Sequence, residues 1–243
     1  IPPLPLGVCV AETQGSIGYM VQQSLQNVLK EKKIDREVVT LITQTIVDKN
    51  DPSINDPQKF IGRRYGKTEA QSLARQFNWT IKEQEPGKWR QVVPSPMPQF
   101  IEHGRSIQTL VDNGTIVIAS GGGGIPTFWN DDHKLEGLNA VIDKDLSAAL
   151  LGRVIKSEEL WIITDLDQVC LNFGKSNEQP LLKITLDEAQ KYFDEGHFQE
   201  GSMGPKIRAA MYFLKHHGKK VIITSIAGVL GAINGSNGTT ITK

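Results

Sequence analysis

Residues 201–206, Gly-Ser-Met-Gly-Pro-Lys, have the composition of a phosphate-binding loop that opens a helix. Two glycines let the backbone turn sharply and approach a ligand closely, and Pro205 has the fixed φ favoured at the first position of a helix. Lys206 would then lie at the helix N-terminus, where free N–H groups and the helix dipole already favour an anion. An ordinary loop with a surface lysine is the alternative for this segment alone. The phosphate interpretation predicts a kinase.

Four consecutive glycines follow a predicted strand that ends at Ser120, and they run from Gly121 to Gly124. In an open α/β sheet, ligands bind beyond the carboxyl ends of the strands. Consecutive glycines expose backbone N–H groups that can wrap an oxyanion or a phosphate. A structural turn would explain two of these glycines. Four in a row cost backbone entropy, so we favour an anion-binding loop.

Lys144 lies between two acids, Asp143 and Asp145, where a predicted helix begins. An aspartate at a helix start is most often a cap, and this would account for one of the two acids. A lysine held by carboxylates is a positioned point charge that can stabilise a phosphoryl group during transfer. The segment is therefore a second candidate for phosphate chemistry.

Three further segments carry weaker signals. Thr164 and Asp165 end a predicted strand, and an aspartate there would orient a lysine or, through water, magnesium, unless it only forms a turn. Phe173 would stack on a base, although a lone aromatic side chain is more often part of a core. Lys49 begins a charged stretch that a lid could bring over a ligand, but alone it suits a solvated surface position.

Composition and the absence of several known motifs disfavour other classes of protein function. The 27 acidic residues balance the 27 basic ones, so no global field would attract nucleic acid or an anionic membrane. The chain has no Gly-x-x-x-x-Gly-Lys-Ser/Thr loop, no Gly-x-Gly-x-x-Gly motif that opens a helix and no His-Glu-x-x-His. Nothing near His197 in the sequence supplies a nucleophile, which disfavours a catalytic triad. Lysines, aspartates and glycine loops remain, and phosphoryl transfer needs this set.

The two cysteines, Cys9 and Cys170, suit free thiols in a reducing compartment, so we expect a cytoplasmic protein. No apolar run approaches the roughly 20 residues that cross a bilayer, so we expect no membrane segment. The chain begins at Ile1 in a proline-rich stretch that is typical of the middle of a protein, so we expect a segment upstream.

Apolar spacing predicts that helices and strands alternate along the chain. We expect helices at residues 16–30 and about 145–155, and strands at 38–47, 115–119, 160–164 and 221–224. Gly114 and Gly218 each end a helical segment just before a strand, where a left-handed glycine is usual. The alternation predicts an α/β fold whose mainly parallel sheet has helices on both faces.

Residues from about 48 to 98 interrupt this alternation, because they are rich in charge and proline. They contain a predicted hairpin in which residues 79–82 and 89–93 flank Pro86 and Gly87. We interpret the stretch as an inserted subdomain or lid.

Taken in order, the motifs cover nearly the whole chain and resemble those of the carbamate kinases, members of the amino acid kinase superfamily. The matching segments are residues 13–20, 47–52, 92–96, 121–126, 141–145, 164–165, 172–175 and 196–206. The inserted segment separates carbamate kinases from relatives that share only the nucleotide lobe.

The resemblance implies an αβα sandwich, a homodimer and reversible phosphoryl transfer between ATP and carbamate, which gives ADP and carbamoyl phosphate. The reaction often runs toward ATP in arginine fermentation, and Mg²⁺ would bridge the phosphates. The rest of a carbamate-binding lobe would occupy residues 1–110, with a protruding subdomain at about 48–98. A nucleotide-binding lobe would occupy residues 111–243.

The matching motifs also imply roles for single residues. Lys144 and Lys206 would stabilise the phosphoryl group in flight, and Asp145 would hold both lysines in place. Lys49 would reach the phosphate from the protruding subdomain. The substrate and phosphate site would be lined by Gly121, Gly122 and Gly123. The nucleotide would be surrounded by Thr164, Asp165, Phe173, Lys175 and Met203.

Two features depart from the family pattern. Family members begin with a strand that carries Gly-Gly-Asn-Ala and later have a Gly-Asn-Gly-Pro-Gln loop, and neither occurs here. We expect the chain to be truncated rather than to have lost part of its site. Residues 85–89 also lack the glycine-arginine pair that is more usual in the family. Two alternatives stay open, namely another small-acid kinase of the superfamily and a non-catalytic nucleotide-binding paralogue.

Overall fold

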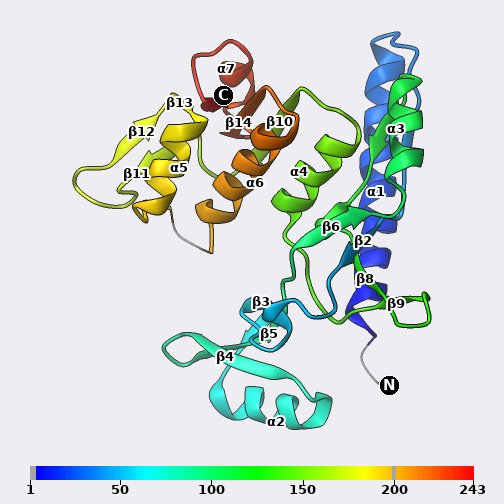
Figure 1. Cartoon of the computed structure of the whole chain (residues 1–243), viewed down its shortest axis with the longest axis vertical. Coiled ribbons are helices and arrows are strands. Elements are labelled where there is room, and N and C mark those ends of the chain that lie inside the picture. The colour runs from blue at the N-terminus through cyan, green and yellow to red at the C-terminus, as the bar shows by residue number, and fades with distance from the viewer. Residues whose placement is uncertain (1–3, 199–200) are drawn as a thin grey trace. The chain divides into compact units, whose positions relative to one another are not determined.

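The computed structural model describes residues 4–198 and 201–243 and has the predicted α/β architecture (Figure 1). The chain forms two compact units, Ile1–Lys144 and Asp145–Lys243. Strands that follow residue 110 pair with strands that precede it, so the first unit extends past the predicted boundary at residues 110 and 111. The division of ligand-binding roles at that boundary stays a prediction.

The first unit is built on one long helix and two short parallel strand pairs. Helix α1 (Leu6–Glu31) contacts β1 (Val38–Thr40), which pairs in parallel with β7 (Ile116–Ile118). Strand β2 (Gln44–Val47) pairs in parallel with β8 (Ile125–Trp129). The antiparallel neighbours of this second pair are β6 (Pro98–Ile101) on β2 and β9 (Leu135–Gly137) on β8, and α3 (Gly104–Asp112) precedes β7.

Two elements of this unit differ from the sequence-based prediction. Helix α1 begins at Leu6 rather than at residue 16, directly after Pro5, a residue that suits a helix start. The strand expected at residues 38–47 is divided into β1 and β2. Where the strand stops, the Thr43 N–H donates to Gln14 Oε1 at 2.8 Å, so a side chain of α1 satisfies the backbone in place of a strand partner.

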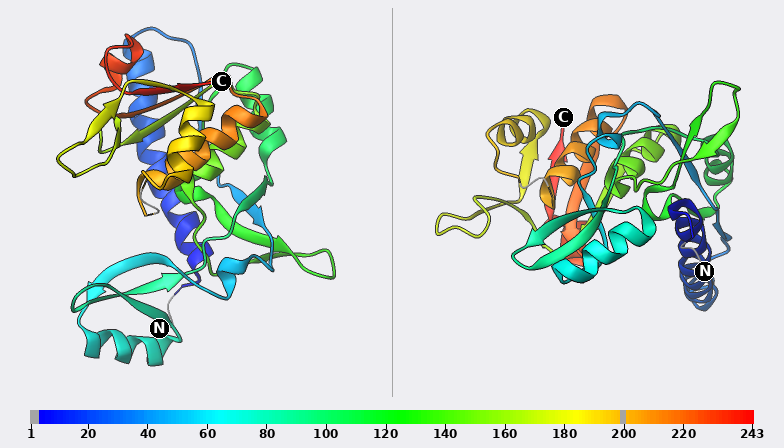
Figure 2. Two further views of the ribbon diagram at one scale, coloured as in Figure 1. Left: turned by 60° about the vertical axis from the view of Figure 1, so that its left-hand side comes forward. Right: turned by 90° about the horizontal axis from the view of Figure 1, so that it is seen from below.

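Residues 48–98, which the sequence predicts to be an inserted subdomain, lie within the first unit and contain several elements of their own. The expected hairpin consists of β4 (Thr80–Glu85) and β5 (Lys88–Val93), and Gly87 in its turn has a φ of 76°. The sequence did not indicate its other elements, which are the 3₁₀ helix η1 (Pro52–Ile54), strand β3 (Lys59–Tyr65) on β5, and α2 (Lys67–Phe77), which packs against β4 and β5 (Figure 2).

The second unit contains a four-stranded sheet in the order β10-β14-β15-β13. Two pairs are parallel, β10 (Glu159–Thr164) with β14 (Lys220–Ser225) and β13 (Lys183–Thr185) with β15 (Thr239–Thr242), whereas β14 and β15 are antiparallel. The helices are α4 (Lys144–Val154), α5 (Leu186–Asp194), α6 (Met203–His216) and α7 (Val229–Ile233). A separate antiparallel pair joins β11 (Val169–Leu171) and β12 (Gln179–Leu181).

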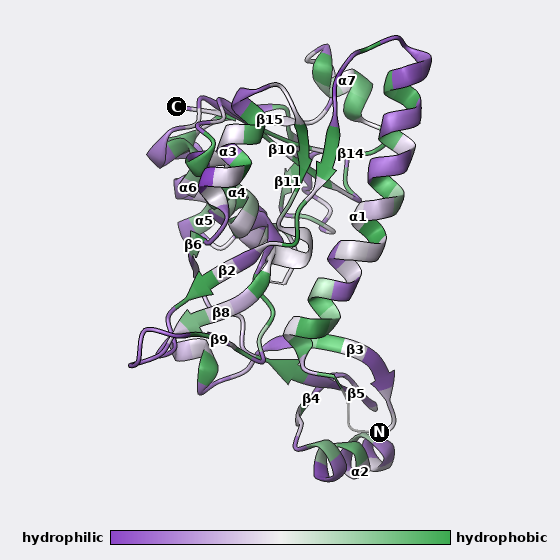
Figure 3. Cartoon of the chain, turned by 90° about the vertical axis from the view of Figure 1, so that its right-hand side faces the viewer, coloured by the Kyte–Doolittle hydropathy of each residue, from purple (hydrophilic) through white to green (hydrophobic). Residues whose placement is uncertain are grey.

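The core of the second unit includes α6 and β14, and β14 is hydrophobic over most of its length (Figure 3). Phe213 of α6 is completely buried. Gly218 lies beside it without a left-handed φ, and a Cβ on Gly218 would overlap the Phe213 ring. The predicted left-handed glycine is therefore confirmed at Gly114, whose φ is 85°, and wrong at Gly218, where close packing excludes a side chain.

Candidate functional site

The glycine loop of the first unit forms a single 3₁₀ turn, η2 (Gly121–Gly123), just after β7. Positive φ angles occur at Ser120, Gly122, Gly123 and Gly124, so the backbone coils tightly. The N–H groups of Gly123 and Gly124 donate back to Ser120 O at 3.0 Å and Gly121 O at 3.2 Å. Within the described residues, the N–H groups of Gly121 and Gly122 have no acceptor. The loop therefore offers two consecutive backbone donors.

The loop lies directly against the segment that carries Asp143 and Lys144. A Cβ on Gly123 would lie 2.5 Å from the Ile142 carbonyl oxygen, and the φ of Gly123 is 94°. Only glycine suits both the conformation and the space. The structure thus brings the glycine loop and residues 142–144 together, although they belong to separate motifs in the sequence.

A lysine that the sequence reasoning missed joins this group. Lys59, on β3 of the inserted subdomain, places its Nζ 3.3 Å from Asp143 Oδ2, and the Asp143 side chain is only 13% exposed. Lys49, which was predicted to reach the phosphate, instead forms an ion pair with Asp131, whose side chain is 93% exposed. No local signal marks Lys59, because its partner is 84 residues away in the chain. The role of Lys49 stays a prediction.

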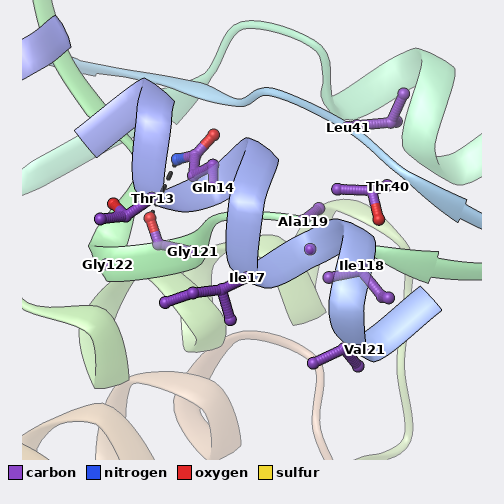
Figure 4. A pocket seen from close by; sticks show the side chains of 11 residues that line it. Thr13, Gln14, Ile17, Val21, Thr40, Leu41, Ile118, Ala119, Gly121 and Gly122 are labelled. Atoms are coloured by element: carbon purple, nitrogen blue, oxygen red, sulfur yellow. Dashed lines mark hydrogen bonds between the residues drawn. The ribbon is translucent and has the colours of Figure 1, made fainter. Parts of the chain in front are cut away.

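A cavity of about 350 Å³ in the first unit is bounded by α1 and the end of β7 (Figure 4). Gly121 and Gly122 form part of its edge, and Ile17, Val21 and Ile118 supply much of its wall. A wall that is mostly hydrocarbon does not suit a small anion.

The second unit holds the predicted lysine and aspartate as a buried ion pair. Lys206 Nζ lies 2.9 Å from Asp145 Oδ2, and their side chains are 12% and 8% exposed. Asp145 is in the first turn of α4 and Lys206 in the first turn of α6. Each of these buried charges stabilises the other, because removal of one leaves the other uncompensated.

The start of α6 is close to the prediction but not identical with it. The helix begins at Met203, so Pro205 is its third residue rather than its first. Proline is tolerated there because the first four N–H groups of a helix have no partner within the helix. Ser202 precedes the helix without a side-chain capping hydrogen bond.

Two of the residues predicted to bind nucleotide meet at a small cavity in the second unit. The cavity is lined by Leu166, Cys170, Phe173, His197, Phe198, Ser202 and Met203. Phe173 is 48% exposed and Met203 is buried, so the pair offers a ring face beside a flexible thioether. Burial raises the pKa of the Cys170 thiol, with Glu178 adding to the shift. Cys170 therefore serves as an uncharged wall residue.

The other predicted nucleotide residues lie outside the lining of this cavity. The Thr164 hydroxyl donates to Asp165 Oδ1 at 3.0 Å at the carboxyl end of β10, and Lys175 is exposed between β11 and β12. Asp167, two residues after Asp165, accepts a hydrogen bond from the Ser225 hydroxyl. Asp167 thus contacts the end of β14, and the role of Asp165 stays a prediction.

In the ranges 4–198 and 201–243, no group of three or more His, Cys, Asp or Glu side chains is arranged to hold a metal ion. None of the helices found there is both long enough and apolar enough to span a bilayer.

Comparisons with known proteins show the family to which the chain belongs. A family model described as the amino acid kinase family matches residues 23–225. The carbamate kinase of Pyrococcus horikoshii is 44% identical over 242 residues, which are 100% of this chain and 77% of that protein. Carbamate kinase 2 of Staphylococcus epidermidis is 44% identical over 241 residues, 99% of this chain and 78% of that protein.

The fold is also similar to solved structures. Carbamate kinase from Giardia lamblia bound to AMP-PNP matches with a TM-score of 0.90 and 42% identity, over 100% of this chain and 77% of that chain.

Proposed function

We propose, from the premise that this chain belongs to the carbamate kinases of the amino acid kinase family, that it transfers a phosphoryl group reversibly between ATP and carbamate. A carbamate oxygen would attack the γ-phosphorus of ATP, and the bond between that phosphorus and the ADP oxygen would break. The products are carbamoyl phosphate and ADP. The observation that carries the proposal is the buried Lys206–Asp145 pair at the start of α6.

Lys206 suits the stabilisation of a phosphoryl group in transfer. Such a group carries its charge on three equatorial oxygens, and catalysis depends mainly on positioning and on neutralising that charge. Asp145 fixes the ammonium group of Lys206, which is already in place before the reaction begins. Carbamate reacts through an oxygen that is already anionic, so no general base is needed.

The glycine loop of the first unit supplies a second set of groups that suit an anion. The N–H groups of Gly121 and Gly122 would donate to an oxygen of carbamate or of the phosphoryl group, and Gly123 lets the loop approach Ile142. Lys144 follows Ile142 by two residues and would add a positive charge. We include Lys59 beside the predicted Lys49, because Lys59 contacts Asp143 directly.

The nucleotide would bind to the second unit. We propose that Phe173 and Met203 contact the base, with Thr164, Asp165 and Lys175 around the rest of the nucleotide. Mg²⁺ prefers phosphate oxygens together with one or two carboxylates, so it needs no dedicated cluster of protein ligands. The exposed Asp165 carboxylate at the end of β10 fits this requirement, and bound Mg²⁺ would neutralise phosphate charge.

The proposal also covers the oligomeric state, the location and the metabolic role of the protein. The protein would act as a homodimer, it would work in the cytoplasm, and it would serve arginine metabolism. The free thiols of Cys9 and Cys170 support a reducing compartment.

The test is ATP formation from ADP and Mg²⁺ with one acyl phosphate at a time, either carbamoyl phosphate or acetyl phosphate. A coupled assay follows the ATP that forms. We expect carbamoyl phosphate to support turnover, and acetyl phosphate to support it at least tenfold less well. Equal or better use of acetyl phosphate would identify a different small-acid kinase. ADP binding without turnover on either compound would contradict the proposal and favour a non-catalytic paralogue.

A further inference from the structure

Helix α1 binds the neighbouring backbone through three glutamine side chains. Gln26 Oε1 accepts from Val38 N–H at 3.2 Å, and Gln22 Oε1 accepts from Thr40 N–H at 2.8 Å. Gln14 Oε1 accepts from Thr43 N–H at 2.8 Å. All three amides therefore satisfy backbone groups along β1 and just after it.

Gln14 differs from the other two because it also reaches the glycine loop. Its Nε2 donates to the Gly121 carbonyl at 2.9 Å (Figure 4). It also donates to the Thr43 carbonyl at 3.3 Å. The residue is only 6% exposed. One acceptor and two donors on a single buried head group match the chemistry of a primary amide and of no other uncharged side chain.

Two threonines complete the support of the loop. The Thr43 hydroxyl accepts from Ser120 N–H at 3.0 Å, and the Thr45 hydroxyl donates to the Gly123 carbonyl at 3.0 Å. Both threonines are completely buried. The loop backbone is thus held at Ser120, Gly121 and Gly123 by side chains from α1, from the link between β1 and β2, and from β2.

The bond to the Gly121 carbonyl also sets the direction of the next N–H group. All peptide bonds in the described residues are trans. The carbonyl of Gly121 and the N–H of Gly122 belong to the same planar peptide group, so they point in opposite directions within that plane. Gln14 Nε2 at 2.9 Å and Gly124 N–H at 3.2 Å both donate to this carbonyl, so the N–H of Gly122 points away from Gln14. This N–H is one of the two donors without an acceptor.

We propose that Gln14 is a positioning residue for the reaction, because its hydrogen bond to the Gly121 carbonyl aims the Gly122 N–H at the anionic substrate. The proposal rests on the proposed role of Gly121, Gly122 and Gly123 in binding carbamate or phosphate. Gln14 itself touches no substrate and acts only through the loop.

The variant Gln14→Glu tests this directly, because glutamate has nearly the same shape. An ionised carboxylate can still accept from Thr43 N–H, but it cannot donate to the Gly121 or Thr43 carbonyls. Burial beside two carbonyl oxygens would raise the pKa of the introduced carboxyl, and its protonated form can donate one hydrogen bond. Among the described residues, none of those that line the cavity beside Gln14 is ionisable, and Glu12 is two residues away on α1.

We expect Gln14→Glu to raise KM for carbamoyl phosphate by about 10-fold or more at high pH, the usual effect of losing a hydrogen bond to a charged group. The defect should shrink as the pH falls and the carboxyl is protonated. KM for ADP should stay unchanged. The matched control is Gln22→Glu, which keeps its acceptor for Thr40 N–H. Within the described residues, no hydrogen bond joins Gln22 to the loop. It should behave like the unmodified protein at every pH.

A second readout does not depend on turnover or on one variant. Amide hydrogen exchange of residues 120–124 should be faster in Gln14→Glu and in Thr45→Val than in Gln22→Glu, and inorganic phosphate should slow it in the unmodified chain. If the unmodified chain turns over no carbamoyl phosphate but the loop exchanges as predicted, the proposed function fails and the support of the loop by Gln14 stands. If Gln14→Glu keeps a normal KM and normal exchange at all pH values, the inference is wrong.

Discussion

The two units hold their candidate chemical groups by opposite means. In the first unit the donors are backbone N–H groups of Gly121 and Gly122, and neutral hydrogen bonds from Gln14, Thr43 and Thr45 hold the loop. In the second unit the key group is a charged side chain, Lys206, held by a buried carboxylate. A backbone site depends on shape, so small steric changes should damage it. A charged site depends on its partner, so loss of the partner should damage both stability and rate.

The largest effect on stability should follow Asp145→Asn. The substitution leaves the 12% exposed Lys206 side chain without its carboxylate, and breaking a buried pair in this way costs about 3–5 kcal/mol. Chemical denaturation should show this loss. In the double variant Asp145→Asn, Lys206→Met, much of the stability should return, because position 206 then carries no buried charge. A double variant that is no more stable than Asp145→Asn alone would contradict this account.

A smaller loss should follow Gly123→Ala in the backbone site. The new Cβ would meet the Ile142 carbonyl at 2.5 Å, and alanine would have to adopt a φ of 94°. Strain of this kind costs about 1–3 kcal/mol. The control is Gly137→Ala, where no atom lies within 4 Å of the added Cβ. Thermal unfolding should give a lower melting temperature for Gly123→Ala than for Gly137→Ala. Equal melting temperatures would show that the loop accommodates the new Cβ without loss of stability.

The two subdomain lysines should differ in their effect on rate. Lys59 contacts Asp143 beside the glycine loop, whereas Lys49 pairs with an exposed aspartate, an interaction worth about 0–1 kcal/mol. We therefore expect Lys59→Ala to lower kcat/KM for carbamoyl phosphate more than Lys49→Ala does. Steady-state kinetics on both variants decide this. A larger loss in Lys49→Ala would restore the role that the sequence motif implies.

The smallest effect should follow Phe173→Ala. The ring is 48% exposed beside Met203, so its removal should leave the melting temperature almost unchanged. Loss of one stacking contact of about 1 kcal/mol should weaken ADP binding several-fold. Isothermal titration calorimetry measures this directly. An unchanged ADP affinity would remove Phe173 from the nucleotide site.

Local patterns in the sequence predicted several elements but not where they stop. The hairpin around Gly87, helix α4 and strands β10 and β14 follow from periodicity and turn residues. The break between β1 and β2 was missed, because the Gln14 side chain that binds the backbone there is 29 residues away in the chain. The error at Gly218 has a similar origin, since the packing of Phe213 leaves no sign in the glycine itself.

The candidate site shows the same limit. The glycines, lysines and aspartates of the site could be identified as candidates from residue type alone. The pairing of Lys206 with Asp145 followed from the family resemblance. Sequence patterns did not indicate Lys59, or the amide and hydroxyl groups that hold the loop, because their roles depend on contacts between distant segments. Neutral polar residues such as Gln14 and Thr45 carry no chemical signature until the fold places them.

The central claim is that Lys206 stabilises the phosphoryl group in transfer rather than only holding α4 and α6 together. The most direct measurement is the rate of ATP formation from carbamoyl phosphate and Mg·ADP by Lys206→Ala, with ADP affinity measured on the same sample. We predict a fall in kcat of about 10²–10³-fold, as for the removal of other transition-state donors, with ADP affinity within a few-fold of normal. A folded variant with near-normal kcat would contradict the claim.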